Sequence, residues 1–449
     1  MAKHIAFAEI ECWRSKLEQL ALDIWNNPEV AYGEYKACEW TAQLLREAGF
    51  RVEVGVGGIK TAIRASCGSG RPVYGLLGEY DALPGMSQKV GIAKEPVTPG
   101  AAGHACGHNL LGVASAGAAI GLKKALEEQG LPGTVVFFGC PAEEVLTGKA
   151  FMARAHVFDD IDFSVSFHPG NYTYIQHGTM TGMNTFKLHF KGRSAHAGGD
   201  PHNGRSALDA VELTHVGINY LREHIPTTVR MHYVITDGGV APNIVPDRAS
   251  AWYFVRAQTR ELVDEVYSRM LEVARGAAQM TGTTVEVEFL GGCYPTLSNG
   301  VLAQTMQDTL LELEQEPWTG EELAFATTLN GEKEMPVPLH TGVLPLNDIP
   351  NFGSTDVGDV QHLAPGIMFF TAGWNTGAPG HNWQIASCAG HSIGLKSMIH
   401  GAKAMAQFGL TVMTDPELLA RAKKEFEEKT QGKPYVCPIP DEVPIPNQS

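Results

Sequence analysis

Apolar and polar residues follow two different periods along the chain. Four segments have the pattern of helices, with apolar residues every three to four positions or an Ala- and Leu-rich stretch: 8–26, 35–48, 110–128 and 148–156. Five shorter β-rich runs are typical of strands: 51–56, 60–66, 73–78, 134–138 and 163–167. Strands that alternate with helices predict an α/β fold, with a doubly wound and mostly parallel sheet that carries helices on both faces.

The pattern changes after residue 182. Six further segments follow the order β-α-β-β-α-β, and they lie at 186–191, 206–223, 229–236, 249–256, 261–279 and 284–289. This order is that of the split βαβ sandwich, so residues 183–293 are predicted to form an inserted ferredoxin-like domain. The α/β pattern then resumes, which predicts a larger domain in two parts, 1–182 and 294–449.

Two segments lack a regular pattern. The stretch 316–350 is rich in Pro, Glu and Gly, so we expect an irregular surface excursion there. From Pro434 on, five prolines predict an extended tail. The length of 449 residues exceeds what one hydrophobic core usually serves, which agrees with two domains.

Composition and charge exclude several classes of partner. Apolar residues make up 44% of the chain and charged residues 18%, as in globular proteins. The net charge of −15 disfavours nucleic acid and anionic membranes as partners, and no apolar run is long enough to span a bilayer. The N-terminus becomes charged too early for a signal peptide, and the eight cysteines are too sparse for a disulfide framework. We therefore expect a cytoplasmic protein in which a cysteine can serve as a metal ligand.

A Cys-x-His pair gives the densest chemical signal. Cys106 and His108 lie in a loop before the predicted helix 110–128, and Gly107 permits a tight backbone between them. Two such side chains can point at one metal ion from a loop. The alternative is a buried cysteine beside a helix-capping histidine, and this pair alone does not decide between the two.

Two adjacent carboxylates follow the predicted strand 134–138. Glu143 and Glu144 therefore lie where ligands bind in sheets of this kind, at the carboxyl end of a strand. Two buried carboxylates are costly unless positive charge is near, and a metal would supply it, with one Glu as ligand and the other as general base. The alternative is a solvated helix N-terminus, which also favours acidic side chains.

Two histidines complete the candidate ligands. His168 closes the predicted strand 163–167, where a hydrogen-bonded core residue is the alternative interpretation. His381 lies in a Gly- and Pro-rich loop, and His391 competes with it because it follows ten residues later. Zinc and manganese both accept such mixed ligands, and a thiolate favours zinc. Five protein ligands are too many for one catalytic ion with an open position, so two divalent ions per subunit are predicted.

Several longer motifs are specific, and they are Asn27-Pro28-Glu29, Gly78-Glu79-Tyr80-Asp81-Ala82-Leu83, Gly107-His108-Asn109-Leu110-Leu111-Gly112, Gly139-Cys140-Pro141 with Glu143-Glu144, Ser354-Thr355-Asp356-Val357-Gly358-Asp359-Val360 and Cys437-Pro438-Ile439-Pro440. With them the chain resembles the co-catalytic metallopeptidase family that contains carboxypeptidase G, aminoacylases and plant auxin-conjugate amidohydrolases. Within that family it is most similar to the bacterial aminobenzoyl-glutamate hydrolases. The resemblance covers nearly the whole chain.

The resemblance implies a role for each of these residues. Five would be metal ligands: Cys106, His108, Glu144, His168 and His381. Glu143 would be the general base, which takes a proton from water and passes it to the leaving amine. Asp81 would orient a ligand histidine and raise its basicity. The chain departs from the family at two positions: Glu79 stands where many relatives have a metal-binding His, and Asn109 replaces the usual Asp. Whether Glu79 is a ligand or structural is open at this point.

The inserted domain resembles the lid and dimerisation domain of the family. The motif around His196 implies that this residue reaches the partner subunit's active site and stabilises the oxyanion, whereas the alternative is a surface histidine. Asn243 and Arg256 match positions that hold the substrate's carboxylate, a task that suits the planar fork of arginine. For Arg256 the alternative is a surface ion pair.

Together these features predict a metal-dependent amidohydrolase for small N-acyl amino acids with a free carboxylate, such as an aminobenzoyl-glutamate-like compound. A dipeptidase for β-alanyl-type dipeptides and an auxin-aspartate-type hydrolase are alternatives within the same chemistry. A non-catalytic binding subunit is the alternative from another class, although the chain keeps Glu143 and all the ligands. The resemblance also implies a dimer, either of this chain or with a similar A-type subunit, whose lid closes about hinges near residues 182 and 293.

Overall fold

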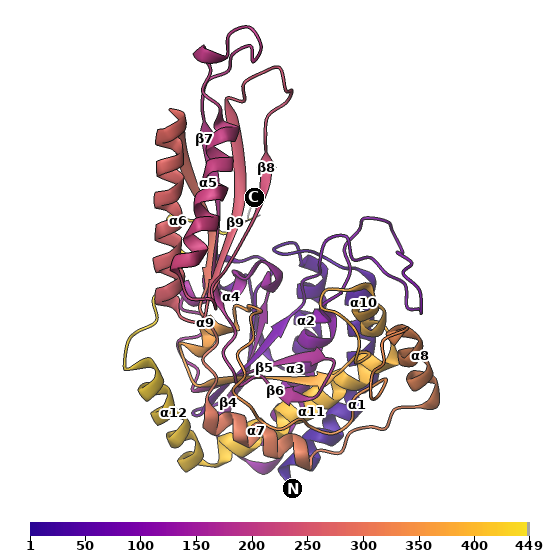
Figure 1. The fold of residues 1–449 in the computed structure, drawn as a ribbon. Coiled ribbons are helices and arrows are strands. Elements are labelled where there is room, and N and C mark those ends of the chain that lie inside the picture. The colour runs from indigo at the N-terminus through magenta and orange to yellow at the C-terminus, as the bar shows by residue number, and fades with distance from the viewer. Residues whose placement is uncertain (447–449) are drawn as a thin grey trace.

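The computed structural model describes residues 1–446, which form two β-sheets in two distinct parts of the molecule (Figure 1). The larger part holds a seven-stranded sheet with helices packed around it. The smaller part, which we call the lid, holds a four-stranded sheet and stands on one end of the larger part. Within the described residues no helix is both long and apolar enough to cross a membrane.

The seven-stranded sheet has the order β1-β2-β4-β3-β5-β11-β6. Its strands are β1 (Arg51–Val54), β2 (Ile63–Ser69), β3 (Val73–Glu79), β4 (Gly133–Cys140), β5 (Phe163–Gly170), β6 (Tyr174–Ile175) and β11 (Gly366–Ala372). The four central strands β4, β3, β5 and β11 are parallel, and the outer pairs are antiparallel. The α/β prediction is confirmed, with the parallel character concentrated at the centre, so four carboxyl ends meet at one edge of the sheet.

Helices cover both faces of this sheet, because its buried strands are apolar on both sides. On one face the core includes side chains of α1 (Ala2–Asn26), α2 (Tyr35–Glu47), α3 (His108–Gln129), α7 (Gly300–Glu312), α11 (Ser392–Thr414) and α12 (Pro416–Thr430). On the other face lie α4 (Gly148–Arg154), α9 (Val357–Gln361) and the C-terminal tail. Leu76 packs on the first face and Leu77 on the second, as the two-residue period of a strand requires.

The lid has the predicted β-α-β-β-α-β order. Its elements are β7 (Gly182–Lys191), α5 (Ala207–Leu221), β8 (Arg230–Asp237), β9 (Arg248–Ala257), α6 (Arg260–Thr281) and β10 (Thr284–Cys293). The sheet order β10-β7-β9-β8 is antiparallel throughout. The helices α5 and α6 cover one face and build a core with it that is separate from the cores of the larger part (Figure 1). Both helices begin at a capping side chain, Ser206 and Thr259, which accepts a backbone N–H bond.

Two expectations for the C-terminal half need revision. The prediction of irregular structure at 316–350 was wrong for α8 (Gly320–Asn330), because Thr319 and Glu322 form a reciprocal capping box that starts a helix there. One more short helix of the larger part, α10 (Trp383–Ala389), precedes α11. The tail from Pro434 contains neither helix nor strand through residue 446, but it is anchored: Ile439 is buried, and Tyr435 donates a hydrogen bond to Asp359. The last residues of the predicted tail, 447–449, lie outside the described part.

A close approach of α3 to β3 gives the first testable prediction. A Cβ added at Gly112 of α3 would lie 2.5 Å from the carbonyl oxygen of Glu79, whereas at Gly276 of α6 it would meet open space. Gly112→Ala should therefore lower the free energy of unfolding by about 1–3 kcal/mol through overpacking. Gly276→Ala is the matched control and should raise it by about 0.5–1 kcal/mol, since Ala is the better helix former. Denaturant unfolding followed by circular dichroism measures both, and equal effects would contradict the close approach.

Candidate metal centre

The predicted ligands lie at the edge of the large sheet where the parallel strands end. Glu79 and Asp81 are at the end of β3, Glu143 and Glu144 follow β4, and His168 is in β5. The loop before α3 adds Cys106, with His108 as the first residue of that helix, and the loop after β11 adds His381. The carboxyl end of a parallel sheet is where ligands bind in folds of this kind.

The donor atoms of these side chains converge in three groups among the described residues. The groups are Cys106 with His108 and His168, Cys106 with Glu144 and His381, and Glu79 with His108 and Glu143, and within each group the donor atoms lie within 4.8 Å of one another. The first two groups contain all five predicted ligands and share Cys106. The third contains Glu79, which the sequence left undecided.

Two of the shortest contacts have the spacing of ligands on one ion. Cys106 Sγ lies 3.4 Å from His168 Nε2, and His381 Nε2 lies 3.5 Å from Glu144 Oε2. Donors bound to one tetrahedral ion at ordinary bond lengths are roughly 3.3–3.6 Å apart. His391, the competitor of His381, instead caps the start of α11 and stacks on Phe325.

His108 is held with one ring nitrogen turned toward the cluster. Its Nδ1 is 2.9 Å from Asp81 Oδ1 and 3.1 Å from the Asp81 carbonyl oxygen, so Nδ1 carries the hydrogen and donates it. Its Nε2 is buried without a hydrogen-bond partner. Burial alone would lower the pKa of His108, but the charges of Cys106 and Asp81 raise it well above the usual range. A buried unpaired nitrogen among carboxylates is what a metal ion would satisfy, so the residues fit the implied metal.

A different contact, with the backbone of Pro169, fixes the ring of His168 in a form that can bind a metal ion. Its Nδ1 donates a hydrogen bond to the carbonyl oxygen of Pro169 at 2.6 Å, which leaves the Nε2 lone pair facing Cys106. Burial lowers the pKa of His168 to about 4, so its ring is neutral at physiological pH. A neutral imidazole with a fixed tautomer is the form that binds metal ions.

A third glutamate, Glu34, holds the turn that carries Glu143 and Glu144. Ala142 and Leu146, on either side of the pair, have left-handed backbone conformations with φ of 61° and 58°. Glu34 accepts a hydrogen bond from the Ala142 N–H at 2.9 Å, and Asp81 Oδ2 accepts one from Glu144 N–H at 2.9 Å. Strained residues persist where the surroundings hold them, often at functional sites.

The same environment raises the proton affinity of both glutamates. Burial, followed by the negative charge of Glu79, raises the pKa of Glu143 well above its usual range. Burial raises the pKa of Glu144 to about 7. These directions hold for the protein without a bound cation, and a divalent ion would favour the ionised forms.

A cavity of about 380 Å³ opens above the cluster. It is lined by the candidate residues Cys106, Glu143, Glu144, His168 and His381, and by Arg256 of the lid strand β9. Its other walls include the aromatic side chains of Tyr174, Phe370 and Trp374. Arg256 Nη1 donates to Ser354 Oγ at 3.2 Å, while its buried Nε has no partner. The cavity therefore joins a metal-binding cluster to an arginine with free hydrogen-bonding capacity.

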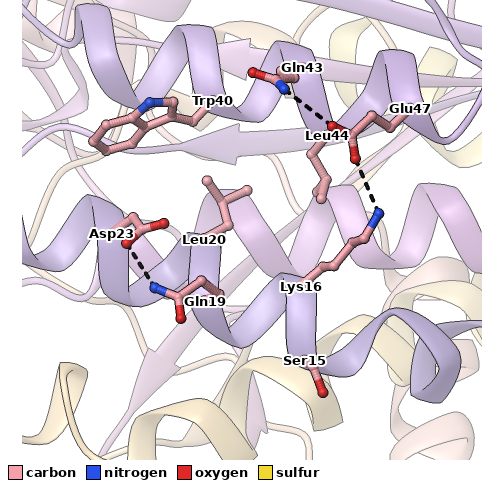
Figure 2. Close-up of a pocket in the computed structure, with 9 residues that line it drawn as sticks. All are labelled: Ser15, Lys16, Gln19, Leu20, Asp23, Trp40, Gln43, Leu44 and Glu47. Atoms are coloured by element: carbon pink, nitrogen blue, oxygen red, sulfur yellow. Dashed lines mark hydrogen bonds and ion pairs between the residues drawn. The ribbon is translucent and has the colours of Figure 1, made fainter.

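A second hollow, between α1 and α2, has a similar volume of about 350 Å³ but different chemistry (Figure 2). Its polar side chains pair with one another, as in the contact of Lys16 with Glu47 at 3.2 Å and of Gln19 with Asp23 at 2.8 Å. It brings together no group of metal donors of the kind found in the first cavity.

Comparison with known proteins agrees with this chemistry. Residues 179–279 match the M20 peptidase dimerisation domain. The B-type subunit of p-aminobenzoyl-glutamate hydrolase from Escherichia coli is 40% identical over 97% of this chain and 96% of its own. The Xaa-Arg dipeptidase of Mus musculus is 30% identical over 96% of this chain and 93% of its own.

The chain belongs to the M20 peptidase family. This is the co-catalytic metallopeptidase family that the motifs predicted, and the resemblance to the B-type subunits of bacterial aminobenzoyl-glutamate hydrolases is confirmed as well. A dinuclear metal-binding M20 peptidase from Bacillus subtilis has the same fold, with a TM-score of 0.59 and 18% identity over 90% of this chain and 99% of its own. The protein is therefore a hydrolase of the metallopeptidase and amidohydrolase type.

Two predicted site residues of this M20 chain lie away from the cluster. His196 is exposed in the connection between β7 and α5. Figure 1 shows that this connection lies at the end of the lid farthest from the larger part. Asn243 is exposed in the connection between β8 and β9, and its carbonyl oxygen accepts a hydrogen bond from Ala197 N–H at 3.0 Å. Neither residue lines the 380 Å³ cavity of its own chain.

Sequence reasoning gave no role to three residues beside the cluster, which are Lys149, Asp356 and Glu34. Lys149, at the start of α4, is fully buried and lies 2.5 Å from both Glu79 and Asp356. A single Lys in an apolar segment of the sequence does not predict ion pairs with two carboxylates from other parts of the chain. Asp356 was visible only as part of the motif 354–360. Glu34, which holds the glutamate turn, likewise lies outside every motif that was identified.

The contact of Asp81 with His108 gives the prediction for this site. Asp81→Asn should lower metal affinity by ~10–100-fold, the usual effect of removing a carboxylate that orients a ligand histidine. Elemental analysis after dialysis against a buffered chelator measures it. Asp162→Asn is the matched control, because Asp162 is also buried and ion-paired, with Lys423, but lies outside the cluster. Wild-type metal affinity in Asp81→Asn would rule out the orienting role.

Proposed function

We propose that this M20 enzyme hydrolyses the amide bond of small N-acyl amino acids that carry a free carboxylate, with an aminobenzoyl-glutamate-like compound as the leading candidate. The observation that carries the proposal is a cavity lined by four of the five predicted metal ligands and by Arg256. If the substrate's amide lay at the cluster, the substrate's carboxylate would lie in the part of the same cavity that Arg256 lines. The name of the Escherichia coli relative supports the substrate class.

Two divalent ions, zinc or manganese, would be held by Cys106, His108, Glu144, His168 and His381. The thiolate of Cys106 favours zinc, because soft ligands prefer it. When bound, the ions would supply Lewis-acid polarisation of the amide carbonyl and lower the pKa of water. The protein's own contribution is to fix these ligands on strand ends and to leave the cavity side open.

Glu143 is the residue that moves protons in this proposal. Its carboxylate lines the cavity and would take the proton of the attacking water, then deliver it to the nitrogen of the leaving amine. The backbone contact of Glu34 with Ala142 keeps this turn in place. The neighbouring charge of Glu79 favours proton uptake by Glu143.

Two walls of the cavity suit the two ends of such a substrate. Arg256 Nε is buried without a partner, so a carboxylate would satisfy it and form the paired bonds that a guanidinium favours. The rings of Tyr174 and Phe370, which also line the cavity, stack with centroids 4.6 Å apart and planes within 5°. A flat aromatic acyl group would extend this stack.

The lid supplies the remaining parts in a dimer, either of this chain or with a similar A-type subunit. His196 Nδ1 accepts hydrogen bonds from the backbone N–H groups of Gly198 at 3.1 Å and Gly199 at 2.9 Å. The ring hydrogen is therefore on Nε2, and this N–H of an exposed side chain is a donor suited to an oxyanion. His196 and Asn243 are proposed to act in the partner subunit's cavity, since neither lines their own.

Closure of the lid is part of the same proposal. The lid joins the larger part at the start of β7 and the end of β10, near residues 182 and 293. Arg260 links the two connections, since its Nη1 donates to the carbonyl oxygens of Met183 at 3.2 Å and Cys293 at 3.1 Å. Hinge motion there would change the distance between Arg256 and the cluster. A cytoplasmic location completes the proposal, and the eight free thiols, all within the described residues, agree with it.

The first test is hydrolysis by the metal-loaded protein over a panel of N-acyl amino acids and dipeptides. Wild type should prefer aromatic N-acyl glutamates. Glu143→Gln should retain its metal but lose at least ~100-fold in turnover, the usual scale for a general base. Glu144→Gln is the neighbouring comparison and should lose metal and turnover together. Full activity in Glu143→Gln, or no divalent metal in active wild type, would falsify the mechanism.

The second test concerns the shared site. His196→Ala should lower turnover by ~10²–10³-fold, as loss of an oxyanion donor does, without changing metal content. Mixing His196→Ala with Glu143→Gln subunits should restore part of the activity, because each hybrid dimer then contains one intact composite site. If exchange of subunits is shown and no activity returns, His196 does not act across the dimer.

A further inference from the structure

Lys149 is buried between two carboxylates beside the candidate metal centre. Its Nζ lies 2.5 Å from Glu79 Oε1 and 2.5 Å from Asp356 Oδ1, and its backbone N–H donates to Asp356 Oδ2 at 2.8 Å. The three residues come from the end of β3, the start of α4 and the start of α9. Lys149 Nζ donates a hydrogen bond to Asp356 Oδ1, whereas its contact with Glu79 Oε1 is an ion pair without a hydrogen bond, and ion pairing offsets the cost of burying these charges.

The other oxygen of Glu79 faces the centre. Glu79 Oε2 lies 3.5 Å from His108 Nε2, the buried ring nitrogen that has no hydrogen-bond partner. This separation is too long for a good hydrogen bond. It agrees with two donors on one ion, which are roughly 3.3–3.6 Å apart. Glu143 Oε2 is farther from the same nitrogen, at 3.9 Å, so Glu79 is the better placed carboxylate of the two.

We propose that Glu79 is a metal ligand of this enzyme, and that Lys149, backed by Asp356, is the positioning residue that holds its carboxylate toward the ion bound by His108. The inference rests on the metal-dependent function proposed above. Oε1 pairs with the charge of Lys149 and Oε2 faces His108, so Glu79 would bind the ion through Oε2. Lys149 is shared with Asp356, so the three side chains together keep one net negative charge that a cation at the centre would offset.

The test measures metal binding rather than turnover. Glu79→Gln leaves Lys149 paired with Asp356 and should fold. It should lower the affinity for one of the two ions by more than the ~10–100-fold expected when a residue that merely orients a ligand is lost. Competition with a chelator of known affinity gives the affinity, and the absorption spectrum of the Co²⁺-loaded protein should change as well. Wild-type affinity and spectrum in Glu79→Gln would overturn the ligand assignment.

The matched control is Glu322→Gln. Glu322 is also buried and bonded to a lysine, with its Oε2 2.8 Å from Lys396 Nζ, but it lies outside the cluster. Its substitution should change thermal stability and leave metal affinity and the Co²⁺ spectrum as in wild type. An equal loss of metal in both variants would show that the effect at Glu79 is one of general stability, and would overturn the ligand assignment.

The positioning role of Lys149 needs a separate variant. Lys149→Met alone leaves two buried carboxylates unpaired and endangers folding. The double variant Lys149→Met/Asp356→Asn removes one charge of each sign and should fold with metal affinity lowered by ~10–100-fold. Unchanged affinity in the folded double variant would overturn the role of Lys149. Absence of metal from wild type would instead defeat the proposed function itself, which keeps the two failures distinct.

Discussion

The site depends on how a group of acidic side chains is kept together at one edge of a parallel sheet. Five carboxyl groups gather where the central strands end, and they belong to Glu79, Asp81, Glu143, Glu144 and Asp356. In a low-dielectric interior such charges repel one another strongly. Lys149 forms ion pairs with two of them, and His108 hydrogen-bonds a third. The remaining charge, together with unpaired nitrogen donors, is what makes the place suited to divalent cations.

The surrounding fold gives this cluster its rigidity. The candidate ligands lie at strand ends, at the start of α3 or in the adjoining loops, and the sheet and the core behind it fix the backbone of these elements. Gly112 lets α3 approach the end of β3 closely enough for His108 to reach Asp81. Contacts that orient the ligands in turn come from residues far away in the sequence, such as Glu34. Preorganisation of this kind is what a catalytic centre requires, since misplaced ligands cost affinity and rate.

The lid relates to the centre in a different way. Arg256 reaches the cavity from β9, close to the junction with the larger part, whereas His196 lies at the opposite end of the same sheet. A single rigid chain therefore presents only one of these two side chains to its own cavity. The residues proposed to serve the chemistry are thus divided between the centre and the lid, and residues 179–279 match a peptidase dimerisation domain.

The sequence alone determined the order of the elements, the inserted β-α-β-β-α-β unit and the five residues that converge in the centre. These depend on local patterns: the period of a helix or strand, and motifs such as Cys106-x-His108 or the paired glutamates after a strand. The prediction of irregular structure at 316–350 missed α8, because a capping box of two side chains, Thr319 and Glu322, outweighed a composition typical of loops. Only the tertiary structure showed that Lys149 is buried between Glu79 and Asp356 and that His196 does not line the cavity of its own chain. The physical reason is that ion pairing and coordination depend on distances between side chains from strand ends that are far apart in the chain, and no local pattern encodes those distances.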